Sequence, residues 1–148
     1  MQRHLIYIII GICLALTSCS LHMSHNGDLD GFWQLRSIEN KVQGTAEDMR
    51  ESQISWSFQG SILEMRNQRM FPLDGWDVIE SFRLESGELI LFSPYLSKRE
   101  EGDVPVEDAT LLNVYGVYQT EEHFKVLELN DEHMVLESAI VRLSFRKY

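Results

Sequence analysis

The stretch QISWSFQ, residues Gln53–Gln59, carries the clearest structural pattern in the chain. Its even-numbered residues are apolar and its odd-numbered residues are polar. Successive side chains of a β-strand point to opposite faces, so this alternation predicts a strand with one buried and one exposed face. The same pattern returns at Val141–Arg146, where apolar residues again alternate with polar ones.

Further stretches with a weaker alternation bring the number of candidate strands to nine, of which we expect about eight to form. Turn-forming pairs at Gln59-Gly60, Ser86-Gly87 and Asn130-Asp131 separate several of them, which predicts antiparallel neighbours joined by hairpins. The polar stretches Asn40–Ser52 and Ser97–Asp108 are expected to be loops, either of which could hold a short helix. The additional candidate strands are Phe32–Ile38, Ile62–Arg66, Trp76–Leu84, Glu88–Ser93, Leu111–Tyr118, Phe124–Leu129 and His133–Glu137.

The need to bury these strands decides the expected fold class. A sheet that is apolar on one face must cover that face with a second sheet or close around it. Closure also removes the exposed edges through which apolar strands aggregate. We therefore favour an all-β fold over residues 31–148, in which one antiparallel sheet of about eight strands forms a meandering barrel; an open sandwich is the alternative.

The first residues of the chain predict export. A short basic segment precedes the apolar run Leu5–Leu16, which is shorter than the roughly 20 residues of a membrane-spanning helix. The sequence Leu-Thr-Ser-Cys at residues 16–19 resembles the lipobox of bacterial lipoproteins. This resemblance implies a signal peptide at residues 1–18, cleavage between Ser18 and Cys19, and diacylglyceryl and N-acyl groups on Cys19. An ordinary cleaved signal with a free cysteine is the alternative.

Residues 19–30 are polar and lack an apolar period, so they predict a flexible tether between the lipid and the domain. Two or more acyl chains anchor a protein stably, whereas one holds it only reversibly. We therefore expect a protein of the bacterial cell envelope, held to a membrane, preferably the outer one, with its domain in the periplasm or at the cell surface. No cofactor is expected apart from the covalent lipid.

Composition argues against several functions. The net charge of −10 would repel nucleic acid. Cys13 leaves with the signal and Cys19 carries lipid, so no thiol remains for a disulfide, a zinc site or a nucleophile. His22 and His25 have no fixed third ligand nearby, so we expect no metal site. No nucleophile with a base is recognisable either, and we expect no catalytic residues and no enzymatic activity.

The tripeptide Gly31-Phe32-Trp33, at the start of the first predicted strand, resembles the Gly-x-Trp signature of lipocalins and related calycins. The resemblance implies an up-and-down barrel of eight strands, in which Trp33 closes one end and an arginine of the last strand lies across its ring. Arg142 or Arg146 would supply that arginine, and Arg146 is preferred because it follows the inward Phe145. With its lipobox and short tether, the chain resembles small bacterial lipocalin-like lipoproteins.

Two predicted strands supply a candidate ligand pocket. Their bulky inward residues could line a pocket or plug the barrel, and the sequence leaves both open. Glu80 interrupts one of these apolar faces. If it points inward, it needs a partner or a water-lined cavity and could orient a ligand amine or hydroxyl; a bulge would instead turn it outward. The candidate residues are Trp56, Phe58, Trp76, Val78, Glu80, Phe82 and Leu84.

Two functions remain open from the sequence. The favoured one is a membrane-anchored module that binds a small apolar or amphipathic molecule in the barrel or at its mouth. The alternative is a non-catalytic accessory protein with a filled barrel, whose outer surface contacts a partner protein of the envelope.

Overall fold

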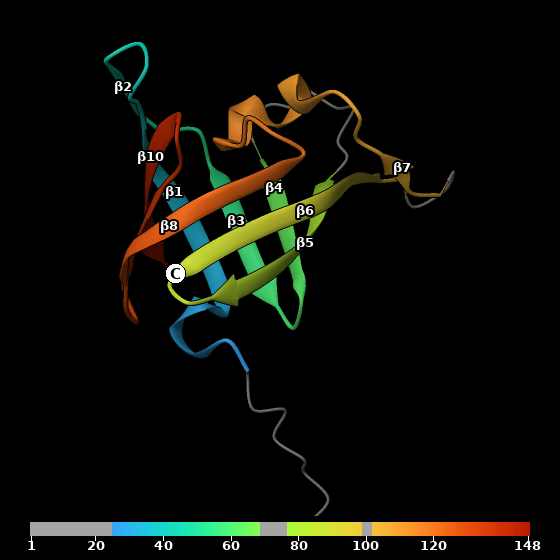
Figure 1. The fold of residues 1–148 in the computed structure, drawn as a ribbon, viewed down its shortest axis with the longest axis horizontal. Helices are drawn as coiled ribbons and strands as arrows, with labels where there is room; N and C mark the ends of the chain where they lie inside the picture. Colours follow the sequence, from blue (N-terminus) through green and yellow to red (C-terminus); the bar gives the residue numbers. More distant parts are fainter. Residues whose placement is uncertain (1–24, 69–76, 99–101) are drawn as a thin grey trace, which may run out of the picture.

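A computed structural model of the chain describes residues 25–68, 77–98 and 102–148. The predicted signal peptide, its cleavage site, Cys19 and Trp76 lie outside these ranges. Within them, every regular element is a strand or a short 3₁₀ helix (Figure 1). The helices are η1 (Gly27–Leu29) and η2 (Ala109–Tyr115). The strands are β1 (Gly31–Asn40), β2 (Thr45–Asp48), β3 (Ile54–Gln59), β4 (Ile62–Asn67), β5 (Asp77–Glu85), β6 (Glu88–Ser97), β7 (Val104–Pro105), β8 (Glu121–Leu129), β9 (His133–Glu137) and β10 (Val141–Lys147).

The strands form one antiparallel sheet that closes on itself. The hydrogen-bonded order is β10-β9-β8-β6-β5-β4-β3-β1, and β10 also pairs with β1, from Trp33 opposite Lys147 to Asn40 opposite Val141. Strand β2 pairs with β1 beside this ring, and β7 pairs with β6. The predicted barrel of about eight strands is therefore confirmed, and β2 and β7 occupy the two stretches that were expected to be loops.

One predicted strand, Leu111–Tyr118, is wrong. This stretch contains the helix η2, in which the buried residues Leu112 and Tyr115 are three apart, as the 3₁₀ repeat requires. Asp108 caps its start, because the carboxylate accepts a hydrogen bond of 2.9 Å from the backbone N–H of Thr110. The apolar content of this stretch is compatible with both a helix and a strand, so composition alone could not distinguish the two structures.

Helix η2 lies across one end of the barrel, opposite the end where the N-terminal segment meets the sheet (Figure 1). Gly116, which ends the helix at φ +87°, packs directly on the inward side chain of Leu143. A Cβ atom at Gly116 would lie 2.6 Å from Leu143 Cδ2, so any other residue would displace the Leu143 side chain and would also be strained at this positive φ. The helix is consequently part of the core. None of the helical segments in the described ranges has the length and hydrophobicity that crossing a bilayer requires.

The opposite end is closed by Trp33, whose side chain is fully buried. Its indole Nε1 donates a hydrogen bond of 2.8 Å to the carbonyl oxygen of Leu29 in η1. Lys147 Nζ lies 4.9 Å from the centre of the Trp33 ring and donates a hydrogen bond of 2.7 Å to the carbonyl oxygen of Asp28. Gly31 lies beneath this lysine, since a Cβ there would be 3.0 Å from Lys147 Cε. The Gly-x-Trp tripeptide thus fits under a cation.

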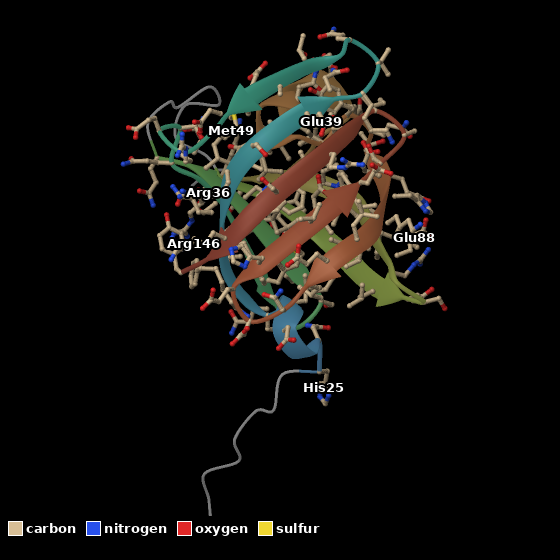
Figure 2. All side chains as sticks on the ribbon, turned by 90° about the vertical axis from the view of Figure 1, so that its left-hand side faces the viewer. His25, Arg36, Glu39, Met49, Glu88 and Arg146 are labelled. Carbon is tan, nitrogen blue, oxygen red and sulfur yellow. The ribbon has the colours of Figure 1, made fainter. Side chains whose placement is uncertain are left out.

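The predicted arginine over Trp33 is wrong, because the cation over the ring is Lys147. Residues 141, 143 and 145 point inward, so the two-residue repeat of β10 places residue 147 on that side and Arg142 and Arg146 outside. Arg142 instead pairs with Glu137 at 2.8 Å and Glu39 at 3.7 Å. Figure 2 shows Arg146 on the outer surface of the sheet.

Replacing this lysine should destabilise the barrel, whereas replacing the neighbouring arginine should not. We expect Lys147→Met to lower the free energy of unfolding by about 1 kcal/mol, since it removes the cation over Trp33 and the hydrogen bond to Asp28. Arg146→Met is the matched control and should change stability by less than about 0.5 kcal/mol, as surface substitutions do. Urea unfolding measures both, and a larger loss for Arg146→Met would contradict the assignment.

Candidate functional site in the barrel interior

The described members of the predicted pocket come together inside the barrel. Trp56 and Phe58 of β3 and Val78, Glu80 and Phe82 of β5 are all buried. The strand β4 connects the two rows, because Met65 stands opposite both Trp56 and Val78, and Leu63 opposite both Phe58 and Glu80. Leu84, near the end of β5, is only half-buried. The grouping of these residues is therefore observed, while ligand binding by them stays a prediction.

An aromatic cluster fills one level of the interior. The centre of the Trp56 ring lies 4.9 Å from that of Phe145 and 6.1 Å from those of Phe58 and Phe124. The rings of Phe58 and Phe82 meet edge to face at 5.0 Å. Because these rings come from β3, β5, β8 and β10, they contact one another across the barrel, and the barrel is plugged at this level.

Glu80 points inward and its side chain is completely buried. The bulge considered from the sequence exists, but its extra residue lies in β6 and not in β5. Ile79 pairs with Tyr95, and Ser81 pairs with Phe92. The single residue Glu80 therefore stands opposite two residues, Ser93 and Pro94. The alternative that a bulge turns Glu80 outward is therefore wrong. Neither carboxyl oxygen has a hydrogen-bond partner among the described residues, and the same holds for the buried Trp56 Nε1.

A second carboxyl group, Glu122 of β8, is also buried, with 3 % of its surface exposed. Unlike Glu80, it has partners: Tyr118 donates its backbone N–H at 2.9 Å, and the backbone of Gln119 and the hydroxyl of Ser138 also donate to it. These bonds fasten the segment after η2 to the barrel wall. Glu122 was not singled out from the sequence, although it is in phase with the inward Phe124; extending the alternation two residues upstream would have found it.

Burial determines the charge of Glu80. It raises the pKa of this carboxyl group from its usual value of 4.5 to about 8, and the nearby carboxylate of Glu122 adds to the rise. Burial also raises the pKa of Glu122, while the hydrogen bonds from Tyr118, Ser138 and Gln119 oppose that rise. At neutral pH the carboxyl group of Glu80 is consequently mostly protonated and neutral.

A hollow opens on the outside of the barrel next to these two residues. The pairing of β6 with β8 stops at Phe92 opposite Glu121, and beyond this point β6 bends away at Ser93, which has φ +56°, to pair with β7. The hollow has a volume of about 600 Å³ and occupies the gap between the two strands. It is lined by Phe92, Ser93, Pro94, Tyr95, Pro105, Val106, Thr120 and Glu121.

A metal site finds no support in the described parts of the chain. No group of three or more His, Cys, Asp or Glu side chains is placed there to hold a metal ion. On the exposed surface, the ring of His123 lies 3.3 Å from the carboxylate of Glu121 and 3.4 Å from that of Glu88. The hydrogen bonds and the charges of Glu121 and Glu88 raise the pKa of His123. The buried residues of the barrel are therefore the better candidate site.

The closed antiparallel barrel, with a buried tryptophan under a cation at one end, is the fold that the Gly-x-Trp resemblance implied. Comparison with known families agrees, because the model of the lipocalin-like domain matches residues 14–148. The chain belongs to this lipocalin-like family. No match of significance was found among curated proteins.

Solved bacterial structures share the fold. A lipocalin-like protein from Bacteroides uniformis is 25% identical and superposes with a TM-score of 0.60 over 82% of this chain and 100% of that one. An uncharacterized protein from Bacteroides eggerthii is 22% identical, with a TM-score of 0.58 over 80% and 98%. A protein from Burkholderia xenovorans is 14% identical, with a TM-score of 0.52 over 80% and 82%. The last two show similarity of fold alone.

The pKa of Glu80 predicts a stability that falls as the pH rises. Between pH 4.5 and about 8 the folded chain keeps a proton on Glu80 that the unfolded chain has released. The free energy of unfolding should therefore decrease through this window, with a slope approaching about 1.4 kcal/mol per pH unit from this group. Glu80→Gln should remove that contribution and be more stable than the natural chain at pH 8.

Urea unfolding at several pH values measures this difference. Glu85→Gln, on the exposed end of the same strand, is the control and should follow the natural chain at every pH. Parallel curves for the natural chain and Glu80→Gln would show that Glu80 has an ordinary pKa.

Proposed function

We propose that this protein is a membrane-anchored, non-catalytic lipocalin-like lipoprotein that binds a small amphipathic molecule inside its barrel. Lipid on Cys19 holds it to a membrane of the cell envelope, and the residues between Cys19 and η1 keep the barrel near that membrane, whereas η1, which was expected to belong to the flexible tether, packs on the barrel. His25 and η1 lie at the end of the barrel that Trp33 closes (Figure 2).

The observation that supports ligand binding best is the unpartnered carboxyl group of Glu80. Buried polar groups in folded proteins almost always have a hydrogen-bond partner, and leaving one without costs about 1 to 3 kcal/mol. Both carboxyl oxygens of Glu80 lack a hydrogen-bond partner among the described residues, and so does Nε1 of Trp56 on β3. A polar ligand group would satisfy the carboxyl group of Glu80, and the ligand's apolar part would lie against the aromatic side chains.

A different observation favours the alternative of an accessory protein with a filled barrel. The ring contacts of Trp56 with Phe124 and Phe145 span the interior, so at that level no ligand fits without moving a side chain. Under this alternative the outer surface carries the function, through contacts with another envelope protein. Ligand titration separates the two functions.

The titration uses the chain from residue 20 onward, which contains every strand of the barrel. We expect a saturable change of intrinsic tryptophan fluorescence with at least one member of a panel of fatty acids, sterols, bile acids, haem and long-chain amines. Trp56 is the reporter, since it lies in the core and Trp33 is shielded by η1. Trp56→Phe should abolish most of the signal. Silence across the panel would favour the filled barrel.

The anchor is tested separately. The full chain with Cys19→Ser should be released from the membrane fraction and should lack the mass of the diacylglyceryl and acyl groups, while its barrel stays folded. Cell fractionation and mass spectrometry provide the measurement, and Cys13→Ser is the control that should stay lipidated. Retention of the Cys19→Ser protein in membranes would refute lipid anchoring without affecting the barrel.

A further inference from the structure

Two of the buried polar side chains in the described barrel are carboxyl groups. Glu80 of β5 and Glu122 of β8 both point inward, one on each side of β6, and they are close enough for the negative charge of Glu122 to raise the pKa of Glu80. Lys147, the cation that contacts the core, lies at the closed end over Trp33 and is already bonded to the carbonyl oxygen of Asp28. The region around Glu80 is therefore acidic.

The barrel wall is interrupted beside this acidic region. Opposite Glu80, β6 carries the bulge of Ser93 and Pro94, and Pro94 has no N–H with which to bond a neighbouring strand. The carbonyl oxygen of Pro94 accepts a hydrogen bond of 2.9 Å from Val106, on the side away from Glu80's strand. The same two residues line the hollow between β6 and β8, so the hollow and Glu80 lie on the two sides of one irregular segment.

The mouth of the hollow has the same sign of charge as the interior. Glu121 lines it, and Glu122, the next residue, points into the barrel. Because side chains of consecutive strand residues point to opposite faces, these two carboxyl groups lie on the outer and inner sides of the wall at the same position. A cation at the hollow would meet a carboxylate outside and then another inside.

We propose that the ligand carries a protonated amine, and that it passes through the hollow between β6 and β8 to bind with its ammonium group at Glu80, near Glu122. This inference rests on the proposed binding function and narrows it to amphipathic amines. An ammonium group has three donors and no acceptor, which matches two carboxyl groups. On binding, Glu80 releases its proton to the solvent and the amine keeps its own, so that one ion pair forms.

An anionic ligand is disfavoured at the same place. A carboxylate or phosphate would have to be buried beside Glu122, and the Coulomb energy and the loss of its hydration would both oppose binding. A neutral alcohol can donate a hydrogen bond to Glu80 but gains no ion pair. For ligands with the same alkyl chain, we therefore expect the affinity to decrease from the amine to the alcohol to the acid.

Three ligands with the same alkyl chain test this order: octylamine, octan-1-ol and octanoic acid, titrated at pH 7 into the chain from residue 20 onward and followed by tryptophan fluorescence and calorimetry. We expect octylamine to bind at least tenfold more tightly than octanoic acid, with octanol between them. Glu80→Gln should weaken octylamine at least tenfold and leave octanol within about threefold. Glu85→Gln, on the same strand but exposed, should leave all three unchanged.

The passage through the hollow has its own test. Thr120→Phe places a larger side chain in the lining and should slow the association of octylamine several-fold in stopped-flow fluorescence. Thr45→Phe on the exposed strand β2 is the control and should leave the rate unchanged. An unchanged rate for Thr120→Phe would place the path elsewhere and overturn that part of the inference.

The possible outcomes separate the two proposals. If octanoic acid binds as tightly as octylamine, or if Glu80→Gln binds octylamine normally, the barrel binds ligands and the amine assignment is overturned. If none of the three binds while another member of the wider panel does, the amine assignment is overturned alone. If nothing binds in either experiment, the binding function fails and the amine assignment fails with it. Circular dichroism spectra verify that each variant is folded.

Discussion

The pairing of β10 with β1 is the interaction on which the rest of the structure depends. It joins the two ends of one antiparallel sheet, from Trp33 opposite Lys147 to Asn40 opposite Val141, and so converts an open sheet into a closed interior. Only a closed wall keeps water from Trp33, and only a closed wall surrounds Glu80 sufficiently to raise its pKa to about 8. The cation over Trp33 is also supplied by β10, so closure of the sheet and closure of the barrel end occur together.

Much of this barrel could be predicted from the sequence, because the two-residue repeat of a strand is a local property. The predictions that failed have three different causes. Leu112 and Tyr115 are spaced for a 3₁₀ turn, but neighbouring apolar residues conceal that spacing. The prediction considered only Arg142 and Arg146, whereas the two-residue repeat of β10, followed to its last residue, places Lys147 on the inward side. For Glu80, the inward direction depended on which of two paired strands contains the extra residue, and a single sequence does not show that.

The interior contains two regions of different character. The rings of Trp56, Phe58, Phe124 and Phe145 fill one region and give the barrel a packed core without any disulfide among the described residues. The other region contains the carboxyl groups of Glu80 and Glu122, beside the place where β6 and β8 separate. A barrel of eight strands is just wide enough to be filled by side chains or to hold one small ligand. Here the filled and the polar regions adjoin, because Leu63 stands opposite both Phe58 and Glu80.

The two buried carboxyl groups provide a comparison within one molecule. Where a buried acid has a structural role, this fold supplies its partners: Glu122 accepts hydrogen bonds from the segment after η2 and thereby fixes that segment to the wall. Glu80 lies in the same interior and receives no such bonds from the described residues, although leucine at this position would avoid the cost of burying an unpartnered polar group. A residue that reduces stability without organising its surroundings is more readily explained by a bound molecule than by folding. That contrast is the physical reason to propose a ligand at Glu80 and a structural role for Glu122.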